Sequence, residues 1–370
     1  MAHKVTMRAW RVEKSGIVNC QLVEDEPIPD NLGDYEVLIK VLAIGLNPID
    51  YKRATSWPGV KYPFILGLDA CGVVEKRGSK VDATRFVENE TMILVFGSTE
   101  NRMGYFAEYT VHDSRYLSVV PKEIYEGKDL TEVACQLAGL PCAAYTAYQI
   151  VYNQLRLFPG EGKQDLRGFK NIVVSAGSGG LGGFCLQFLK LWRDSLKEEE
   201  REKVKLIATC SHRNVDYVKK LGATDVVDYT NESIVKRLFE LSDGQGVDVF
   251  IDNVGFENRR MGKESLGYGG QFVISVESGD NFGVNELWDK GQSVHSVLIL
   301  GNYLSKNHDK MEQLRFIGDE VLKLYAEEKI HVPIGEILQF ENVREGLEKL
   351  HGRHVRGKLV ARVARLNTIE

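Results

Sequence analysis

Short apolar runs, broken by turn residues at close spacing, fill the first 140 residues of the chain. Runs of this kind that are rich in Val, Ile and Leu and bounded by turn residues are typical of β-strands. They predict strands at residues 36–46 (EVLIKVLAIGL), 71–79 (CGVVEKRGS), 91–98 (TMILVFGS) and 106–113 (FAEYTVHD). We therefore expect a β-rich first domain.

The pattern becomes helical from Pro141, where small and apolar residues continue through CAAYTAYQIVYNQLRL (142–157). The polar stretch 158–170 then predicts a loop that leads into a second domain. Beyond it lie predicted strands at 171–175, 204–209, 247–251 and 271–276, with predicted helices from about 181 and over about 215–221. Such alternation is typical of a parallel sheet covered by helices on both faces. The predicted fold class is α/β.

Composition narrows the possible partners. A chain of 370 residues with 43% hydrophobic residues is long enough to bury the cores of two domains. A net charge of −5 and a pI near 6.0 give no basic field for nucleic acid. No apolar run approaches the roughly 20 residues that a membrane span requires. We expect an ordinary soluble protein whose partners include neither nucleic acid nor a membrane.

Two features bear on the cellular compartment. The N-terminal residues MAHKVTMRAW lack the charged-then-apolar pattern of a secretory signal. The six cysteines are scattered singly and form no C-x-x-C motif, so we expect buried thiols in a reducing compartment. Both features predict a cytoplasmic location.

A glycine-rich turn, SAGSGGLGG (175–183), follows the apolar stretch 171–174 and matches the pattern G-x-G-x-x-G. In a strand-turn-helix unit, Gly177 would permit the tight turn and Gly179 would let the backbone approach a pyrophosphate. Gly182 would let helix and strand pack closely. The alternative is a plain structural turn, but the strand before it and the helix after it favour dinucleotide binding.

The helix after this turn is predicted to begin at about Leu181, and both Gly180 and Leu181 are candidate cofactor contacts. Its first N–H groups and partial positive charge would meet the phosphates of the cofactor. The tip of the next strand indicates which dinucleotide binds, because NAD sites usually place an acid there. This chain has Ser211, His212 and Arg213 instead. A hydroxyl and a guanidinium suit a 2′-phosphate, so NADPH is predicted, the alternative being a solvated basic turn.

Several motifs occur in the order seen in a known family: GLNPIDYK, LGLDACGVV, GYFAEY, LAGLPCAAYTAY, SAGSGGLGG, KKLGATDVVDY, DNVG and RGKLV. The chain resembles the medium-chain dehydrogenases/reductases, and within them the zinc-independent quinone oxidoreductase and enoyl reductase branch. The resemblance implies a GroES-like catalytic domain over 1–150 and 310–370 and a Rossmann nucleotide-binding domain over 151–309. It also implies an active-site cleft where the two meet, and it implies that a homodimer is common.

The resemblance implies roles for single residues as well. Asn47 would lie beside the nicotinamide ribose, Lys52 would contact the substrate oxygen, and Tyr51 is the alternative donor. Asp50 would brace their loop. The resemblance also implies cofactor contacts from Thr146, Tyr229, Asn253 and Gly255. Each of these residues could equally serve the fold.

A metal is not expected. Zinc-dependent relatives carry a catalytic Cys and a Gly-His-Glu motif, whereas this chain has Asn47 and Gly67-Leu68-Asp69 at the matching places. An amide and a leucine cannot supply the thiolate and imidazole that zinc selects, and the four-cysteine lobe of structural zinc is also missing. His351 and His354 are closely spaced, but no carboxylate or Cys accompanies them, which favours a surface pair.

Without zinc, hydride transfer requires a substrate whose own conjugation spreads the negative charge. Quinones and α,β-unsaturated carbonyls meet this requirement, because hydride addition gives an enolate that a few donors can stabilise. The predicted function is therefore an NADPH-dependent reductase of a quinone or an enone. One alternative is a non-catalytic or regulatory family member that binds the cofactor. The other is a zinc-free protein like an alcohol dehydrogenase.

Overall fold

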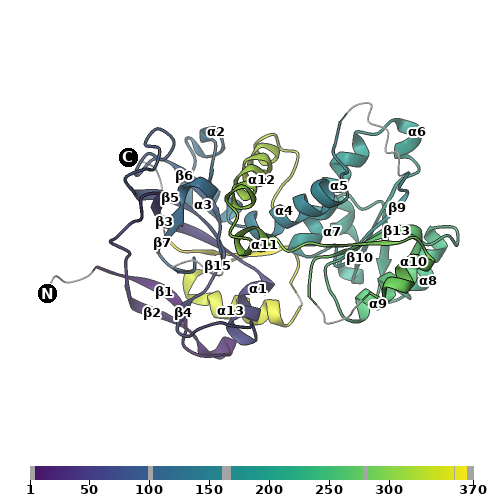
Figure 1. Ribbon diagram of the computed structural model, residues 1–370, viewed down its shortest axis with the longest axis horizontal. Helices are drawn as coiled ribbons and strands as arrows, with labels where there is room; N and C mark the ends of the chain where they lie inside the picture. Colours follow the sequence, from purple (N-terminus) through teal and green to yellow (C-terminus); the bar gives the residue numbers. More distant parts are fainter. Residues whose placement is uncertain (1–4, 99–102, 161–167, 278–281, 354, 365–370) are drawn as a thin grey trace. The chain divides into compact units, whose positions relative to one another are not determined.

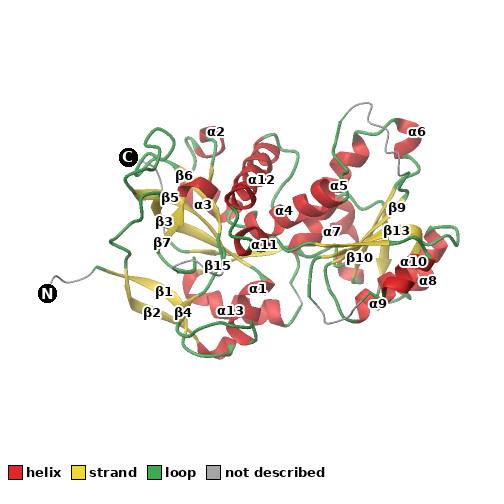
Figure 2. Cartoon of the chain, in the orientation of Figure 1, coloured by secondary structure: helices red, strands yellow, loops and turns green. Residues whose placement is uncertain are grey.

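The computed structural model describes residues 5–98, 103–160, 168–277, 282–353 and 355–364. The chain divides into two compact units. The first unit comprises Met1–Tyr145 and Leu300–Glu370, and the second comprises Thr146–Ile299. Strands dominate the first unit, and strands and helices alternate in the second (Figure 2).

A large sheet forms the centre of the first unit, with the described strands in the order β15-β16-β3-β5-β6-β8 and with β7 also paired to β3. A smaller sheet has the order β2-β1-β4. The strands of the unit are β1 (Thr6–Val12), β2 (Cys20–Pro27), β3 (Glu36–Leu46), β4 (Phe64–Ile65), β5 (Asp69–Arg77), β6 (Met92–Phe96), β7 (Tyr109–Asp113), β8 (Ser118–Val119), β15 (Ile334–Gln339) and β16 (Lys358–Arg362).

Helices flank this sheet at its ends and along its surface. They are α1 (Pro48–Thr55), α2 (Lys122–Tyr125), α3 (Leu130–Leu137), α4 (Pro141–Tyr148), α11 (Gly301–Leu304), α12 (His308–Ala326) and α13 (Val343–His351). The helix α4 is followed directly by a π-helical turn at Gln149–Gln154.

Strand register in the large sheet places three chain segments side by side. Strand β16 pairs antiparallel with β3 so that Leu359 faces Leu46, and β3 pairs with β5 so that Gly45 faces Asp69. A side chain at Gly45 has no room, because its Cβ would lie 2.1 Å from the carbonyl oxygen of Ala138. This register brings the end of β3 and the starts of β5 and β16 to one point.

A parallel six-stranded sheet forms the second unit, in the order β11-β10-β9-β12-β13-β14. Its strands are β9 (Asn171–Val174), β10 (Lys205–Cys210), β11 (Asp225–Asp228), β12 (Val247–Asp252), β13 (Leu266–Ile274) and β14 (Ser293–Ser296). Numbered along the chain, this is the order 3-2-1-4-5-6 of a doubly wound dinucleotide fold, which confirms the predicted Rossmann architecture. The order reverses between β9 and β12, where such folds bind their ligands.

Helices cover both faces of this sheet. They are α5 (Gly180–Asp194), α6 (Glu198–Arg201), α7 (Val215–Lys220), α8 (Ile234–Leu241), α9 (Glu257–Ser265) and α10 (Val284–Asp289). In Figure 1 the strands lie between α5 on one side and α8 and α9 on the other. Apolar residues of α8 pack with Val173, Ile207, Phe250 and Phe272 in one buried cluster, as the alternation of side chains along strands requires.

All six cysteines are free thiols, and Cys142 is the one that is partly exposed. Among the described residues, no helix is long and apolar enough to cross a bilayer.

Candidate functional site

The glycine-rich turn joins β9 to α5 at the carboxyl end of β9. Gly179 is the N-cap of α5, and the first turn of the helix contains no acidic residue. Gly180 and Leu181, which begin the helix, are partly exposed. The first N–H groups of a helix have no intrahelical acceptor and carry a partial positive charge. The turn therefore presents donors that suit an anion such as a pyrophosphate.

The three glycines of the motif differ in the space around them. A Cβ at Gly177 would lie 2.8 Å from the Cβ of Ala208, and a Cβ at Gly182 would lie 2.3 Å from the carbonyl oxygen of Ala176. The fold itself requires these two glycines. A Cβ at Gly179 would meet only the Ala176 oxygen, at 3.4 Å, which is an ordinary contact. The space beside Gly179 is open, as the approach of a pyrophosphate to the backbone requires.

Asn253, which follows β12, ties the glycine turn to the neighbouring strand ends. Its backbone N–H donates to Ser175 Oγ at 2.8 Å, and its Nδ2 donates to the Ser175 carbonyl oxygen at 3.0 Å. The Ser275 hydroxyl donates to Asn253 Oδ1 at 2.7 Å. Gly255, at φ 79°, donates its N–H to the buried carboxylate of Asp252 at 2.9 Å. Asn253 and Gly255 therefore build the loop at the switch point, whatever contact they make with a cofactor.

The next residue, Phe256, has an unfavourable backbone conformation for a bulky side chain. Its φ is 50° and its ψ is −129°, and its side chain is 56% exposed. Backbone strain of this kind costs about 1–3 kcal/mol. We expect Phe256→Gly to raise the free energy of unfolding by about 1 kcal/mol, because glycine adopts this conformation freely. Phe256→Ala keeps a Cβ and serves as the control, and chemical denaturation of both variants measures the difference.

The tip of β10 lies close to the glycine turn. Buried Asn214 donates from Nδ2 to Ser178 Oγ and to Ser211 Oγ, at 3.2 Å each. This amide fixes Ser211 relative to the turn. Arg213 lies between these residues in the short helix His212–Asn214 and is exposed. Ser211 and Arg213 are thus placed near the turn, with the guanidinium accessible to a ligand.

An acid does lie beside the β10 tip, but it comes from β11. Asp228 Oδ2 contacts His212 Nδ1 at 3.1 Å and accepts from Asn231 Nδ2 at 2.6 Å. Its other oxygen accepts from the backbone N–H and hydroxyl of Thr230, at 3.1 and 2.5 Å. The hydrogen bond from the Thr230 side chain is the main cause that lowers the pKa of Asp228. The adjacent Tyr229, predicted to contact the cofactor, is 54% exposed.

In the first unit, a buried polar cluster lies where the register brings β3, β5 and β16 together. Asn47 follows β3 and caps α1, Asp69 begins β5, and Lys358 begins β16. The Asn47 Nδ2 donates to Asp69 Oδ2 at 2.7 Å, and the Lys358 Nζ donates to Asn47 Oδ1. Lys358 Nζ also donates to the Leu46 carbonyl oxygen at 3.2 Å and lies 3.7 Å from Asp69 Oδ2. All three side chains of the cluster are buried.

The cluster also fixes the starts of two helices. The Asn47 N–H donates to Asp50 Oδ2 at 2.8 Å, which braces the start of α1 as predicted. Asp69 accepts from the Cys142 N–H of α4, at 3.1 and 3.2 Å to its two oxygens. The helix α1 carries the candidates Tyr51 and Lys52, and α4 carries the candidate Thr146.

Burial determines the acidity of the two carboxylates. It raises the pKa of Asp50 to about 7 and that of Asp69 to about 6, although cations lie near both. Asp50 is fully buried, and among the described residues its Oδ1 has no hydrogen-bond partner. The neighbouring Arg53 is also buried, its guanidinium lies 5.0 Å from the ring centre of Phe64, and burial lowers its pKa.

The candidate donors on α1 differ in exposure. Tyr51 is nearly buried, and its ring meets the ring of His351 edge-on with centroids 5.2 Å apart. Lys52 is partly exposed, and Trp57 beyond the helix is partly exposed as well. Thr146 on α4 is buried. Lys52 is therefore the more accessible of the two donors, and their roles stay predictions.

The positions that match metal ligands of zinc-dependent relatives do not form a donor set. Leu68 is fully buried as an apolar residue, and the Asn47 oxygen already accepts from Lys358. Within the described ranges, no group of three or more His, Cys, Asp or Glu side chains is arranged to hold a metal ion. His351 contacts Tyr51, and His354 lies outside the described residues.

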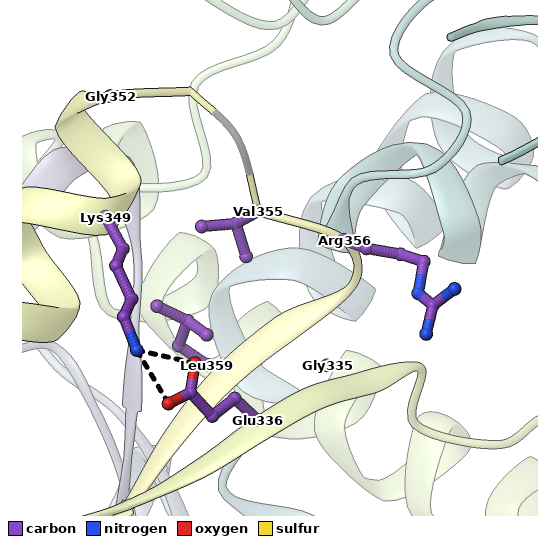
Figure 3. Close-up of a pocket in the computed structure, with 7 residues that line it drawn as sticks. All are labelled: Gly335, Glu336, Lys349, Gly352, Val355, Arg356 and Leu359. Atoms are coloured by element: carbon purple, nitrogen blue, oxygen red, sulfur yellow. Dashed lines mark hydrogen bonds and ion pairs between the residues drawn. The ribbon is translucent and has the colours of Figure 1, made fainter. Parts of the chain in front are cut away.

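A separate hollow of about 400 Å³ lies against β15, β16 and α13 (Figure 3). It is lined by Gly335, Glu336, Lys349, Gly352, Val355, Arg356 and Leu359. The Lys349 Nζ binds both oxygens of Glu336, at 2.7 and 2.9 Å, and the Arg356 side chain points away from this pair. Because side chains alternate along β16, Leu359 faces this hollow and Lys358 faces the buried cluster. The hollow is thus distinct from the cluster, and Lys349 and Glu336 form an ion pair within it.

Comparison with known families covers both parts of the chain. The family described as "Alcohol dehydrogenase GroES-like domain" matches residues 33–122, and the family described as "Zinc-binding dehydrogenase" matches residues 221–360. The NAD(P)H oxidoreductase RTN4IP1, mitochondrial, of Danio rerio is 26% identical over 393 residues, which cover 98% of this chain and 92% of that protein. The chain belongs to the medium-chain dehydrogenase/reductase superfamily. It is an oxidoreductase with a GroES-like β domain and a Rossmann domain.

Two further relatives place the chain in the zinc-independent branch of this superfamily. The trans-enoyl reductase pgmF of Aspergillus terreus is 31% identical over 262 residues, which cover 68% of this chain and 65% of that protein. The quinone oxidoreductase structure from Coxiella burnetii is 26% identical and superposes with a TM-score of 0.73, covering 97% of this chain and all of that one. Since the Danio relative is mitochondrial, a cytoplasmic location stays a prediction.

Sequence reasoning did not find several residues that hold the site together. Asn214, Asp228 and Lys358 are examples. Lys358 lies in the RGKLV motif, which contributed to the family resemblance but assigned the lysine no role. Strand register alone brings it to Asn47, 311 residues away in sequence.

Proposed function

We propose that the protein is an NADPH-dependent, zinc-independent reductase that transfers hydride to a quinone or to an α,β-unsaturated carbonyl compound. The open space beside Gly179, at the start of α5 and next to the switch point of a 3-2-1-4-5-6 sheet, is the observation that carries this proposal. NADPH, when bound, supplies the hydride. The names of the relatives, an NAD(P)H oxidoreductase, a trans-enoyl reductase and a quinone oxidoreductase, support the same reaction class.

The preference for NADPH over NADH rests on the tip of β10. No carboxylate occupies the tip itself, where Ser211 is fixed by Asn214 and Arg213 is exposed. The oxygens of nearby Asp228 accept hydrogen bonds from its own turn, which leaves them poorly placed for a ribose hydroxyl. A guanidinium and a hydroxyl together suit the 2′-phosphate.

We expect Arg213→Ala to weaken NADPH binding roughly tenfold, the effect of losing about 1.4 kcal/mol of charge-assisted hydrogen bonding. NADH affinity should stay within about twofold, because NADH lacks the phosphate. Titration of nucleotide fluorescence measures both constants. Arg237→Ala, which removes a partly exposed arginine of α8 that pairs with Glu232 and Glu240, is a control for loss of positive charge. Equal affinity of the parent protein for both nucleotides would contradict the phosphate assignment.

The side chains of the GroES-like domain would stabilise the acceptor. We propose that Lys52 or Tyr51 donates toward the oxygen on which enolate charge develops, and that Asn47 lies beside the nicotinamide nucleoside. An ammonium or a phenol near a developing enolate lowers the barrier and supplies a proton. A conjugated acceptor suits this donor set because no single oxygen has to carry the full charge that a metal would otherwise stabilise.

Single-turnover oxidation of NADPH by a panel of quinones and enones tests the function. Consumption of one equivalent of NADPH with reduction of the acceptor supports it. NADPH binding without turnover across the panel supports instead the alternative of a non-catalytic cofactor-binding protein. Lack of binding of either nucleotide rejects both.

A further inference from the structure

The amide of Asn47 is held in one orientation by opposite charges on its two ends. Its Oδ1 accepts from the Lys358 ammonium, and its Nδ2 donates to the Asp69 carboxylate at 2.7 Å. A flipped amide would face the ammonium with its own NH₂ group and the carboxylate with its own oxygen. Because the cluster is buried, both mismatches would be unrelieved by water. The orientation is therefore fixed by Lys358 and Asp69 together.

In this orientation one of the two amide hydrogens of Asn47 makes only a long hydrogen bond, which a ligand oxygen could replace. Nδ2 carries two hydrogens, and one is used by Asp69. The other has the Gly45 carbonyl oxygen at 3.5 Å, the outer limit of a hydrogen bond. The oxygen of the amide, in contrast, is occupied by the ammonium. Asn47 can act toward a ligand as a donor, and the contact with Lys358 polarises the amide in the direction that strengthens this donation.

Lys358 also holds the surroundings of the amide. Its Nζ donates to the Leu46 carbonyl oxygen at 3.2 Å and lies 3.7 Å from Asp69, which accepts from the start of α4. The ammonium of Lys358 is thus surrounded by one carbonyl oxygen, one amide oxygen and one carboxylate. Oxygen atoms of these kinds are also the usual ligands of bound cations. The chain supplies this positive charge from its own strand β16.

We propose that Lys358 is a positioning residue, which acts through Asn47 and fixes that amide as a hydrogen-bond donor to an oxygen of the bound ligand. The proposal rests on the proposed function for the identity of that ligand. The oxygen is a ribose hydroxyl of the nicotinamide nucleoside or the carbonyl of the acceptor substrate. In either case the matching ligand group is an acceptor, and a ligand that presents only a donor there is excluded.

A double-mutant cycle tests whether Lys358 acts through Asn47. We expect Asn47→Ala and Lys358→Met each to lower kcat/KM by about 10- to 100-fold. The kcat/KM of the double variant should be at most about twofold below that of the less active single variant. Losses that multiply in the double variant would overturn the proposal. A fall in NADPH affinity identifies the ribose hydroxyl as the partner, and a fall in kcat at unchanged NADPH affinity identifies the substrate carbonyl.

Stability has to be separated from positioning, because Lys358→Met leaves a buried carboxylate without its cation. The variant Lys358→Met with Asp69→Asn removes both charges. We expect its thermal stability to recover while its activity stays low, since neither end of the Asn47 amide is then directed by charge. Recovery of activity together with stability would show a purely structural role. Lys128→Met, which removes a lysine that donates to the Ile124 carbonyl oxygen, is the matched control.

Hydrogen exchange of the Asn47 side chain tests the role of Lys358 without any substrate. The ¹⁵N-resolved side-chain NH₂ signals of Asn47 should exchange slowly with water in the parent protein and much faster in Lys358→Met. Unchanged exchange in the variant would overturn the proposal even if the parent protein reduced no quinone or enone. Failure of the parent to turn over, with the change in exchange observed, would reject the proposed reaction and leave the role of Lys358 in place.

Discussion

Gly179→Ala should fold as stably as the parent protein and bind NADPH about 100-fold more weakly. The added Cβ meets only the Ala176 carbonyl oxygen at 3.4 Å, so the folded chain accommodates it. The methyl group would nevertheless occupy the open space through which a pyrophosphate reaches the backbone N–H groups. A hundredfold loss corresponds to about 2.7 kcal/mol, the cost of losing charged hydrogen bonds to phosphate. Calorimetric titration with NADPH and thermal unfolding of the same sample measure both quantities.

Two other glycines give the controls. Gly182→Ala should lower the free energy of unfolding by about 2–4 kcal/mol, because its Cβ would lie 2.3 Å from a backbone oxygen that cannot yield. Gly283→Ala changes another helix N-cap of the same unit, where the nearest atom to the Cβ is also 3.4 Å away. It should alter neither stability nor NADPH affinity. Full affinity in Gly179→Ala would refute the placement of the pyrophosphate at this turn.

Asp50→Asn should gain stability relative to the parent protein as the pH rises. Burial raises the folded-state pKa of Asp50 to about 7, whereas an unfolded carboxyl titrates near 3.8. The native state therefore holds the proton more tightly, and the contribution of Asp50 to stability is complete below about pH 4 and lost as the pH rises toward 7. Asparagine resembles the protonated acid at every pH. The free energy of unfolding of Asp50→Asn minus that of the parent should therefore increase by about 2 kcal/mol from pH 5 to pH 7.

Urea denaturation at a series of pH values measures this difference. Asp82→Asn is a control of opposite sign, because a hydrogen bond from the Thr84 side chain lowers the pKa of this exposed carboxyl. The pH dependence of the free energy of unfolding should differ between Asp82→Asn and the parent only under acid conditions. A difference between Asp50→Asn and the parent that is constant from pH 5 to pH 8 would mean that Asp50 stays ionised in the folded protein.

The parts of the fold that could be predicted are those with strong local patterns. The apolar run at 36–46 is β3, and the glycine turn between apolar and helical stretches is the β9–α5 connection. Strand β11, four residues long, and helix α8 escaped prediction. The β11 sequence DVVD gives too short a run for the apolar period to show.

The candidate residues of the site also differ in whether a local sequence pattern indicates them. Gly179 and Arg213 were predicted because a local motif and the residue type at a strand tip carry the chemistry. Lys358 and Asn214 were missed because their contacts depend on register and loop packing, which no short window of sequence contains. The general acid stays a prediction for the same reason, since Tyr51 and Lys52 lie next to each other in sequence and differ chiefly in exposure.

The insertion of β16 beside β3 affects the order in which the protein can form during synthesis. The Rossmann domain, Thr146–Ile299, is a continuous stretch and has all its strands as soon as it leaves the ribosome. The GroES-like sheet lacks β15 and β16 until residues 334–362 emerge, so the Ala43–Leu46 end of β3, which lies beyond its pairing with β7, has one unpaired edge in the nascent chain. An exposed edge of this kind is prone to aggregation, and stalled chains that end before residue 358 should be the ones that chaperones retain.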